Sequence, residues 1–193
     1  MARSLTRSPL TRLGIRPASV RSRLIALADA ATADEWAAGR SWYAGYQRVA
    51  MELGAISGTS ASHGAALIAA TSPRTRWSAN LAMARGVAMG DAHVPGLKRN
   101  VATARRALTL ADPAEVFRGP KTRAFHANLS GDESAVTLDI WMCRAMGVTP
   151  ATLARVGVYE ALADIVRNLA ARYDVTPAQF QAVVWVQIRG AAA

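Results

Sequence analysis

The sequence has very little cysteine and lysine and no long apolar segment. Its 193 residues include one cysteine, Cys143, which excludes a disulfide framework, a cysteine-rich zinc site and a four-cysteine iron–sulfur cluster within this chain. No apolar run approaches the roughly 20 residues of a membrane-spanning helix, so we expect no membrane partner. His63, His93 and His126 share no metal-ligand spacing, and no acidic cluster lies beside them. We therefore expect neither a metal nor a cofactor.

Acidic residues are scarce relative to basic ones. Thirteen Asp and Glu against 23 Lys and Arg give a formal net charge of +10, which favours a polyanionic partner such as DNA. Only Lys98 and Lys121 are lysines, and the other cations are arginines. An arginine is in effect never deprotonated, whereas a lysine with a lowered pKa can act as a nucleophile. The two lysines are therefore candidates for chemistry that needs an amine.

The apolar content separates a folded region from a basic N-terminal segment. A hydrophobic fraction of 51% excludes a disordered chain, and the length suits one domain or two small lobes. Residues 1–23 contain six arginines and no acid, which predicts a flexible basic arm that follows DNA phosphates or, alternatively, an organelle transit peptide. In residues 24–193, alanine-rich segments with apolar residues three or four positions apart predict a single all-α domain.

Local signals predict where the helices begin. Thr32 with Glu35, Asp112 with Glu115, and Thr176 with Gln179 have the spacing of a capping box. Three prolines follow Asp or Thr at first helical positions, at Pro113, Pro150 and Pro177. The expected helices cover residues 24–31, 33–53, 62–71, 77–89, 97–110, 113–117, 121–129, 140–147, 150–155, 158–173 and 177–189.

The segment 112–147 combines a turn, a lysine and a carboxylate. A short helix over 113–117 is expected to turn at Gly119, which can take a positive φ at low cost, so that the next amides converge at a helix N-terminus. Such a turn binds a phosphate through its N–H groups. Lys121 lies in the first turn of the following helix, and Asp139 opens the next one.

These residues resemble a known family. Gly119-x-Lys121-Thr122, followed by Asp139 eighteen residues after the lysine, is similar to the helix–hairpin–helix DNA glycosylases of the endonuclease III superfamily. Segments 66–72, 98–108 and 184–190 resemble three further helices of that family in the same order. The first glycine of the family hairpin is missing, and the cysteine cluster of the iron–sulfur branches is absent. The phrase Ser-Pro-Arg-Thr-Arg-Trp resembles bacteriophage members of the superfamily.

The resemblance implies a two-lobed, all-α glycosylase-like domain that extrudes a damaged or modified base from DNA and cuts its glycosidic bond. Asp139 would stabilise the positive charge that develops on the sugar, and Lys121 would attack C1′ and give AP-lyase activity. One lobe would cover about 62–133 and the other 24–61 with 134–193, and the two catalytic residues would face each other across the cleft. The implied DNA contacts are Arg74, Arg76, Trp77, Lys98, Arg99, Arg118, Gly119 and Arg123. We expect a monomer in the bacterial cytoplasm, encoded by the host or by a phage.

Other interpretations of the same residues stay open. A transferase of this fold that modifies thymine bases in phage DNA would use Asp139 differently and would need a pocket for a co-substrate. A DNA-binding module without catalysis needs only the basic surface. Asp139 can be an ordinary helix N-cap, Lys121 a solvated or phosphate-binding side chain, and Trp141 and Trp185 packing residues of the core.

Overall fold

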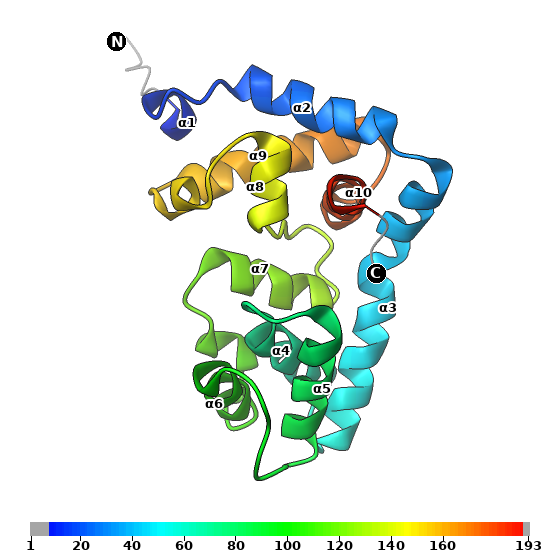
Figure 1. Ribbon diagram of the computed structural model, residues 1–193, viewed down its shortest axis with the longest axis vertical. Helices are drawn as coiled ribbons and strands as arrows, with labels where there is room; N and C mark the ends of the chain where they lie inside the picture. Colours follow the sequence, from blue (N-terminus) through cyan, green and yellow to red (C-terminus); the bar gives the residue numbers. More distant parts are fainter. Residues whose placement is uncertain (1–7, 191–193) are drawn as a thin grey trace. The chain divides into compact units, whose positions relative to one another are not determined.

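The computed structural model describes residues 8–190, and this part of the chain is helical without any strand (Figure 1). The expected all-α class is therefore confirmed. Internal contacts divide the chain into two compact units. We call residues 8–42 with 136–190 the split unit and residues 43–135 the continuous unit. The sequence predicted lobe boundaries near 61 and 133, so residues 43–61 belong to the continuous unit and not, as expected, to the C-terminal helices.

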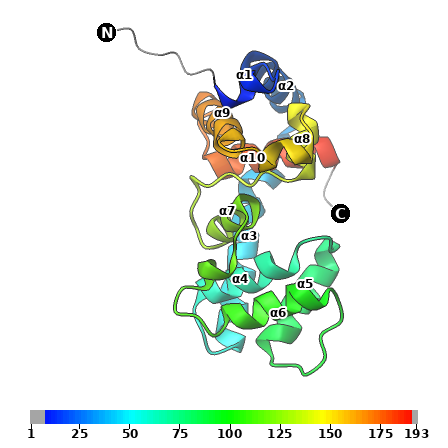
Figure 2. The same cartoon turned by 90° about the vertical axis from the view of Figure 1, so that its left-hand side faces the viewer.

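The split unit packs around helix α10 (Pro177–Arg189). This helix contacts α2 (Pro17–Ala30), α8 (Ile140–Met146) and α9 (Val158–Arg172), as Figure 2 shows. The other elements of this unit are α1 (Pro9–Arg12), the first part of α3 (Ala33–Ile56) and the 3-10 helix η2 (Pro150–Ala154). Fully buried side chains of its core include Leu24, Leu138, Met142, Leu162 and Phe180.

The continuous unit packs around helix α4 (Ala61–Thr71), in which every residue from 64 to 71 is buried. Around it lie α5 (Trp77–Ala88), α6 (Lys98–Ala107), the 3-10 helix η1 (Pro113–Val116) and α7 (Pro120–Leu129), together with the second part of α3. Small side chains allow this burial, because an alanine side chain ends at Cβ and neighbouring helices can approach closely. Gly64 is the closest approach: a Cβ at this position would collide with the carbonyl oxygen of Ala50 in α3.

The capping signals of the sequence are found at two of the three predicted places. Thr32 and Glu35 form a reciprocal box, with Thr32 N–H donating to Glu35 Oε2 at 2.8 Å and Glu35 N–H donating to Thr32 Oγ1 at 3.2 Å. Thr176 and Gln179 form the same arrangement at the start of α10. Asp112 instead acts alone and accepts from the Ala114 N–H at 2.9 Å. Prolines begin η1, η2 and α10, as expected.

The expectation of a flexible basic arm over residues 1–23 is wrong for residues 8–23, and residues 1–7 lie outside the described part. Residues 9–12 and 17–30 are helical, with Leu10 and Val20 only 1% and 2% exposed. The arginines of residues 8–23 are exposed. Their number dominates the composition of the segment, so the composition alone predicted a solvated arm and not buried apolar positions. Leu10 and Val20 join the core of the split unit.

Among residues 8–190, no helix is both long and apolar enough to cross a membrane.

Replacing Leu10 by alanine should destabilise the protein by about 2–4 kcal/mol, because a fully buried leucine leaves a cavity when it is truncated. Leu13 is the matched control, since it follows the same short helix and its side chain is 43% exposed. Leu13→Ala should change the unfolding free energy by less than about 0.5 kcal/mol. Urea unfolding measures both variants, and equal midpoints for Leu10→Ala and the wild type would contradict the packing of α1.

Candidate functional site

Asp139 is the N-cap of helix α8 in the split unit, and both of its carboxylate oxygens are engaged. Oδ1 accepts hydrogen bonds from the N–H groups of Trp141 and Met142, each at 2.9 Å. Oδ2 accepts from the indole N–H of Trp185 at 3.0 Å. These three donors fix the orientation of the carboxylate. The residue as a whole is partly buried.

The extended segment that leads into Asp139 is held by a buried tyrosine. The Tyr159 hydroxyl donates to the carbonyl of Val136 at 2.8 Å and accepts from the N–H of Leu138 at 3.1 Å. Burial raises the pKa of Tyr159 to about 12, so its phenol stays protonated and remains able to donate. Tyr159 therefore positions the residues immediately before the carboxylate.

Two tryptophan rings and two arginines lie on α8 and α10, the helices that contact this carboxylate. The Trp185 ring lies 4.8 Å from the ring of Trp42, and the guanidinium of Arg189 lies over Trp185 at 4.7 Å. On α8, the guanidinium of Arg144 lies over the ring of Trp141 at 4.4 Å. Neither arginine forms an ion pair with a carboxylate in residues 8–190. The site thus combines one fixed anion with flat apolar surfaces and two cations that have no acidic partner.

The turn before Lys121 lies in the continuous unit. Gly119 is the N-cap of α7 with φ −89° and ψ 142°, so the predicted positive φ is wrong. A Cβ there would lie 3.7 Å from Thr122 Oγ1, which is an ordinary contact, so this turn does not need glycine. Arg123 closes the turn, since its Nε donates to the carbonyl of Phe117 at 2.7 Å. Lys121 is exposed in the first turn of α7.

A cavity of about 190 Å³ lies beside this turn and gathers residues from α4, α6, η1 and the first turn of α7. Arg99 and Arg118 both line it, together with the hydroxyls of Thr103 and Thr122. The structure therefore brings two of the predicted DNA contacts together. Lys98 is exposed at the start of α6, next to Arg99.

The three candidates at the N-terminal end of α5, Arg74, Arg76 and Trp77, differ in their surroundings. The ring of Trp77 lies 4.4 Å from that of Tyr46 and 6.4 Å from that of Phe125, both in T-shaped arrangements. Its packing joins α3, α5 and α7 within the continuous unit. Arg74 and Arg76 are exposed, and Arg74 adopts a positive φ of 60°, which is uncommon for a residue with a Cβ. These two arginines are the members of the loop that can reach a ligand.

Lys121 and Asp139 belong to different units, so their predicted meeting across a cleft stays a prediction. Within residues 8–190 no group of three or more His, Cys, Asp and Glu side chains could hold a metal ion.

One family model matches residues 7–192, and its description is "Family of unknown function (DUF7178)". The chain belongs to this family. The match spans all the described helices of both units, so they form one family region. No curated protein and no solved structure matches the chain.

Four residues of the Asp139 site were not assigned there from the sequence. Trp141 and Trp185 were assigned to the core, and Arg144 and Arg189 were not singled out. A usable signal existed in the spacing, because Trp141 and Arg144 are three residues apart and Trp185 and Arg189 are four apart. On a helix, such pairs lie on the same face.

His126 anchors the helix that carries Lys121. It is 6% exposed, and its Nε2 lies 3.0 Å from the carbonyl oxygen of Ser62 in α4. Burial lowers the pKa of His126 below its ordinary value of 6.5, more than the nearby carboxylate of Asp112 raises it. The neutral ring donates from Nε2 and joins α7 to the start of α4.

This pKa shift predicts that stability falls in mild acid. Because the unfolded chain binds a proton near pH 6.5 and native His126 does so only at lower pH, the stabilisation is complete above about pH 6.5 and declines as pH falls from there. Urea unfolding at several pH values between about 7 and 5 measures the slope. His126→Gln should flatten it, and His93→Gln, which changes an exposed histidine, should leave it unchanged. If the dependence of the unfolding free energy on pH is unchanged in His126→Gln, that dependence arises from other groups.

Proposed function

We propose that this protein acts on DNA as a glycosylase, with Asp139 as the carboxylate beside the sugar. The proposal rests on the hydrogen bonds that hold the Asp139 side chain. Two backbone amides and an indole donate to the side chain and fix its orientation, and the residue is only partly buried. Cleavage of a glycosidic bond passes through a cation at C1′, and a fixed anion stabilises that cation without reorganising as it forms.

Unneutralised cations of the continuous unit support DNA as the partner. Seven basic residues and only two acidic ones lie between positions 98 and 123. None of these seven basic side chains forms an ion pair with a carboxylate of residues 8–190. Exposed cations without acidic neighbours bind phosphates with a strong dependence on salt.

In this proposal Lys121 is the amine that attacks C1′. The nitrogen–carbon bond would form as the bond from C1′ to the base breaks, and the base would leave with a proton. This attack gives a closed-ring aminal at C1′. The Schiff base forms when the bond from C1′ to O4′ then breaks and O4′ takes up a proton, and it permits elimination of the 3′ phosphate. Lys121 is exposed in the first turn of α7, so an incoming DNA strand can reach its amine.

One observation favours a second candidate, a DNA-binding module without catalysis. Every hydrogen bond that Asp139 makes also serves the structure: two cap α8 and the third ties α8 to α10. An aspartate with these roles needs no reaction to explain its presence.

Lys121→Ala should abolish covalent trapping by borohydride on duplex DNA with one abasic site, because trapping requires a Schiff base with a primary amine. Lys98→Ala is the matched control, since Lys98 is the only other lysine of the chain and is exposed in the first turn of its own helix. It should trap like the wild type. DNA affinity should stay within about threefold of the wild-type value in both variants. Covalent trapping of the Lys121→Ala variant would show that Lys121 is not the nucleophile.

Asp139→Asn should lower base release by about 100-fold or more and leave DNA affinity within about threefold, because asparagine caps a helix but carries no charge. The substrates are duplexes with a panel of damaged and modified bases, and mass spectrometry detects the released base. Asp112→Asn is the control, since Asp112 caps η1 through one oxygen. Full release by Asp139→Asn would favour the DNA-binding module.

A further inference from the structure

A larger cavity of about 610 Å³ lies in the continuous unit, away from the turn that carries Lys121. It is lined by the loop before α5, by α5 itself and by residues 91–97 before α6. The volume falls within the roughly 300–1,000 Å³ of small-molecule sites. None of the residues proposed for catalysis lines it, so this cavity needs its own explanation.

The sequence builds one wall of the cavity with a glycine. Gly96 adopts a φ of +135°, and a Cβ at this position would lie 2.5 Å from Cε of the buried Met83. The positive φ favours glycine at this position. Arg105 fixes the same loop, because its guanidinium donates to the carbonyls of Asp91 and Ala92 at 2.7 and 3.1 Å. The loop is therefore held in place beside the cavity.

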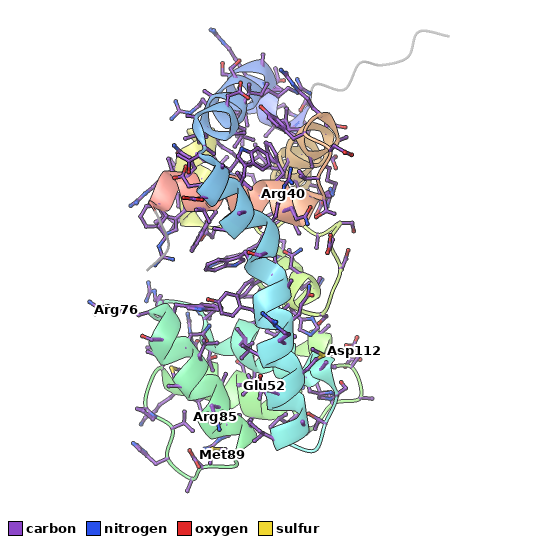
Figure 3. The ribbon with its side chains drawn as sticks, turned by 90° about the vertical axis from the view of Figure 1, so that its right-hand side faces the viewer. Arg40, Glu52, Arg76, Arg85, Met89 and Asp112 are labelled. Carbon is purple, nitrogen blue, oxygen red and sulfur yellow. The ribbon has the colours of Figure 1, made fainter. Side chains whose placement is uncertain are left out.

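Two cations line the cavity. Arg74 and Arg76 are exposed, and neither forms an ion pair with a carboxylate in the described part of the chain. Figure 3 shows Arg76 projecting from the start of α5, with Arg85 further along the same helix. Arg74 holds a positive φ of 60°, and such strain in a residue with a Cβ is typical of binding loops. Two arginines in this arrangement suit a phosphate group.

The rest of the lining is apolar except for one carboxylate. Ala79, Ala82, Met83, Val94, Pro95 and Leu97 supply the apolar surface. Asp91 also lines the cavity, and its Oδ2 lies 3.1 Å from the position of a Cβ built on Gly86. An apolar surface suits the face of a planar ring, and a carboxylate accepts hydrogen bonds from an amino group on that ring.

We propose that this cavity binds a nucleotide. Arg74 and Arg76 hold its phosphate, the apolar residues of α5 and the loop cover its base, and Asp91 accepts from an exocyclic amino group. A free deoxynucleoside monophosphate and a single nucleotide of a DNA strand share this chemistry. The inference does not depend on catalysis at Asp139 or Lys121, although the two arginines also belong to the proposed DNA contacts.

Calorimetric titration of the full chain with the four 2′-deoxynucleoside 5′-monophosphates tests the site. We expect at least one with an exocyclic amino group to bind with a Kd of about 1 mM or tighter, and inorganic phosphate to bind at least about tenfold more weakly. Arg76→Ser should weaken nucleotide binding about tenfold through the lost charged hydrogen bonds. Ala82→Trp should weaken it as strongly by filling the cavity, since Ala82 is exposed and the substitution disturbs no core contact.

Matched variants separate this site from general basicity. Arg85→Ser removes an exposed arginine of α5 that does not line the cavity and should leave the Kd unchanged. Asp91→Asn should reduce the preference for amino-bearing bases over thymine. The proposal is overturned if no nucleotide binds at about 10 mM, if inorganic phosphate binds as tightly as nucleotides, or if Ala82→Trp binds like the wild type.

Competition identifies the source of the nucleotide. A short single-stranded oligonucleotide that displaces the bound nucleotide, and does so more weakly in Ala82→Trp, assigns the site to a nucleotide of a DNA strand. Nucleotide binding that resists the oligonucleotide assigns it to the free molecule. Both results are independent of borohydride trapping, so failure of the glycosylase proposal and failure of this one are distinguishable.

Discussion

The approach of helix α4 to helix α3 at Gly64 is the contact on which the continuous unit depends. Any side chain at this position would collide with the carbonyl group of Ala50, so the approach of the two backbones requires glycine. Residues 64–71 of α4 are buried, and this helix contacts α5, α6 and α7. The exposed cations of the unit sit on these outer elements. Their spacing is therefore fixed by a helix that itself carries no charge.

A hydrogen bond has the comparable role in the split unit. Trp185 on α10 donates to Asp139 at the start of α8, and this contact joins residues 46 positions apart in the sequence. The ring of the same tryptophan also contacts the ring of Trp42 and the guanidinium of Arg189. A single side chain thus links the packing of three helices to the orientation of the one carboxylate on which we base a function.

The sequence predicted most helices because their signals are local. Proline in a first turn and reciprocal capping pairs, as at Thr32 with Glu35, involve residues within four positions of each other. They can therefore be recognised in the sequence without knowledge of the tertiary structure. The helices before residue 24 were missed because exposed arginines are interspersed with the few apolar residues. Leu10 is buried by residues that are distant in the sequence, so its burial could not be predicted locally. Asp139 was singled out through a resemblance. Its bond to Trp185 could not be predicted, since only the fold brings α10 to α8.

The interrupted sequence of the split unit has a consequence for how the chain acquires its structure during synthesis. The continuous unit, residues 43–135, is one uninterrupted stretch of sequence, so we expect it to fold before residues 136–190 have been synthesised. Residues 8–42 emerge first but find their partners in 136–190, and Leu10, Val20 and Leu24 must wait for α8, α9 and α10. Their pairing closes a loop that spans the whole continuous unit and raises the contact order of the chain. Early folding of residues 43–135 shortens that loop to the distance between the ends of a compact body.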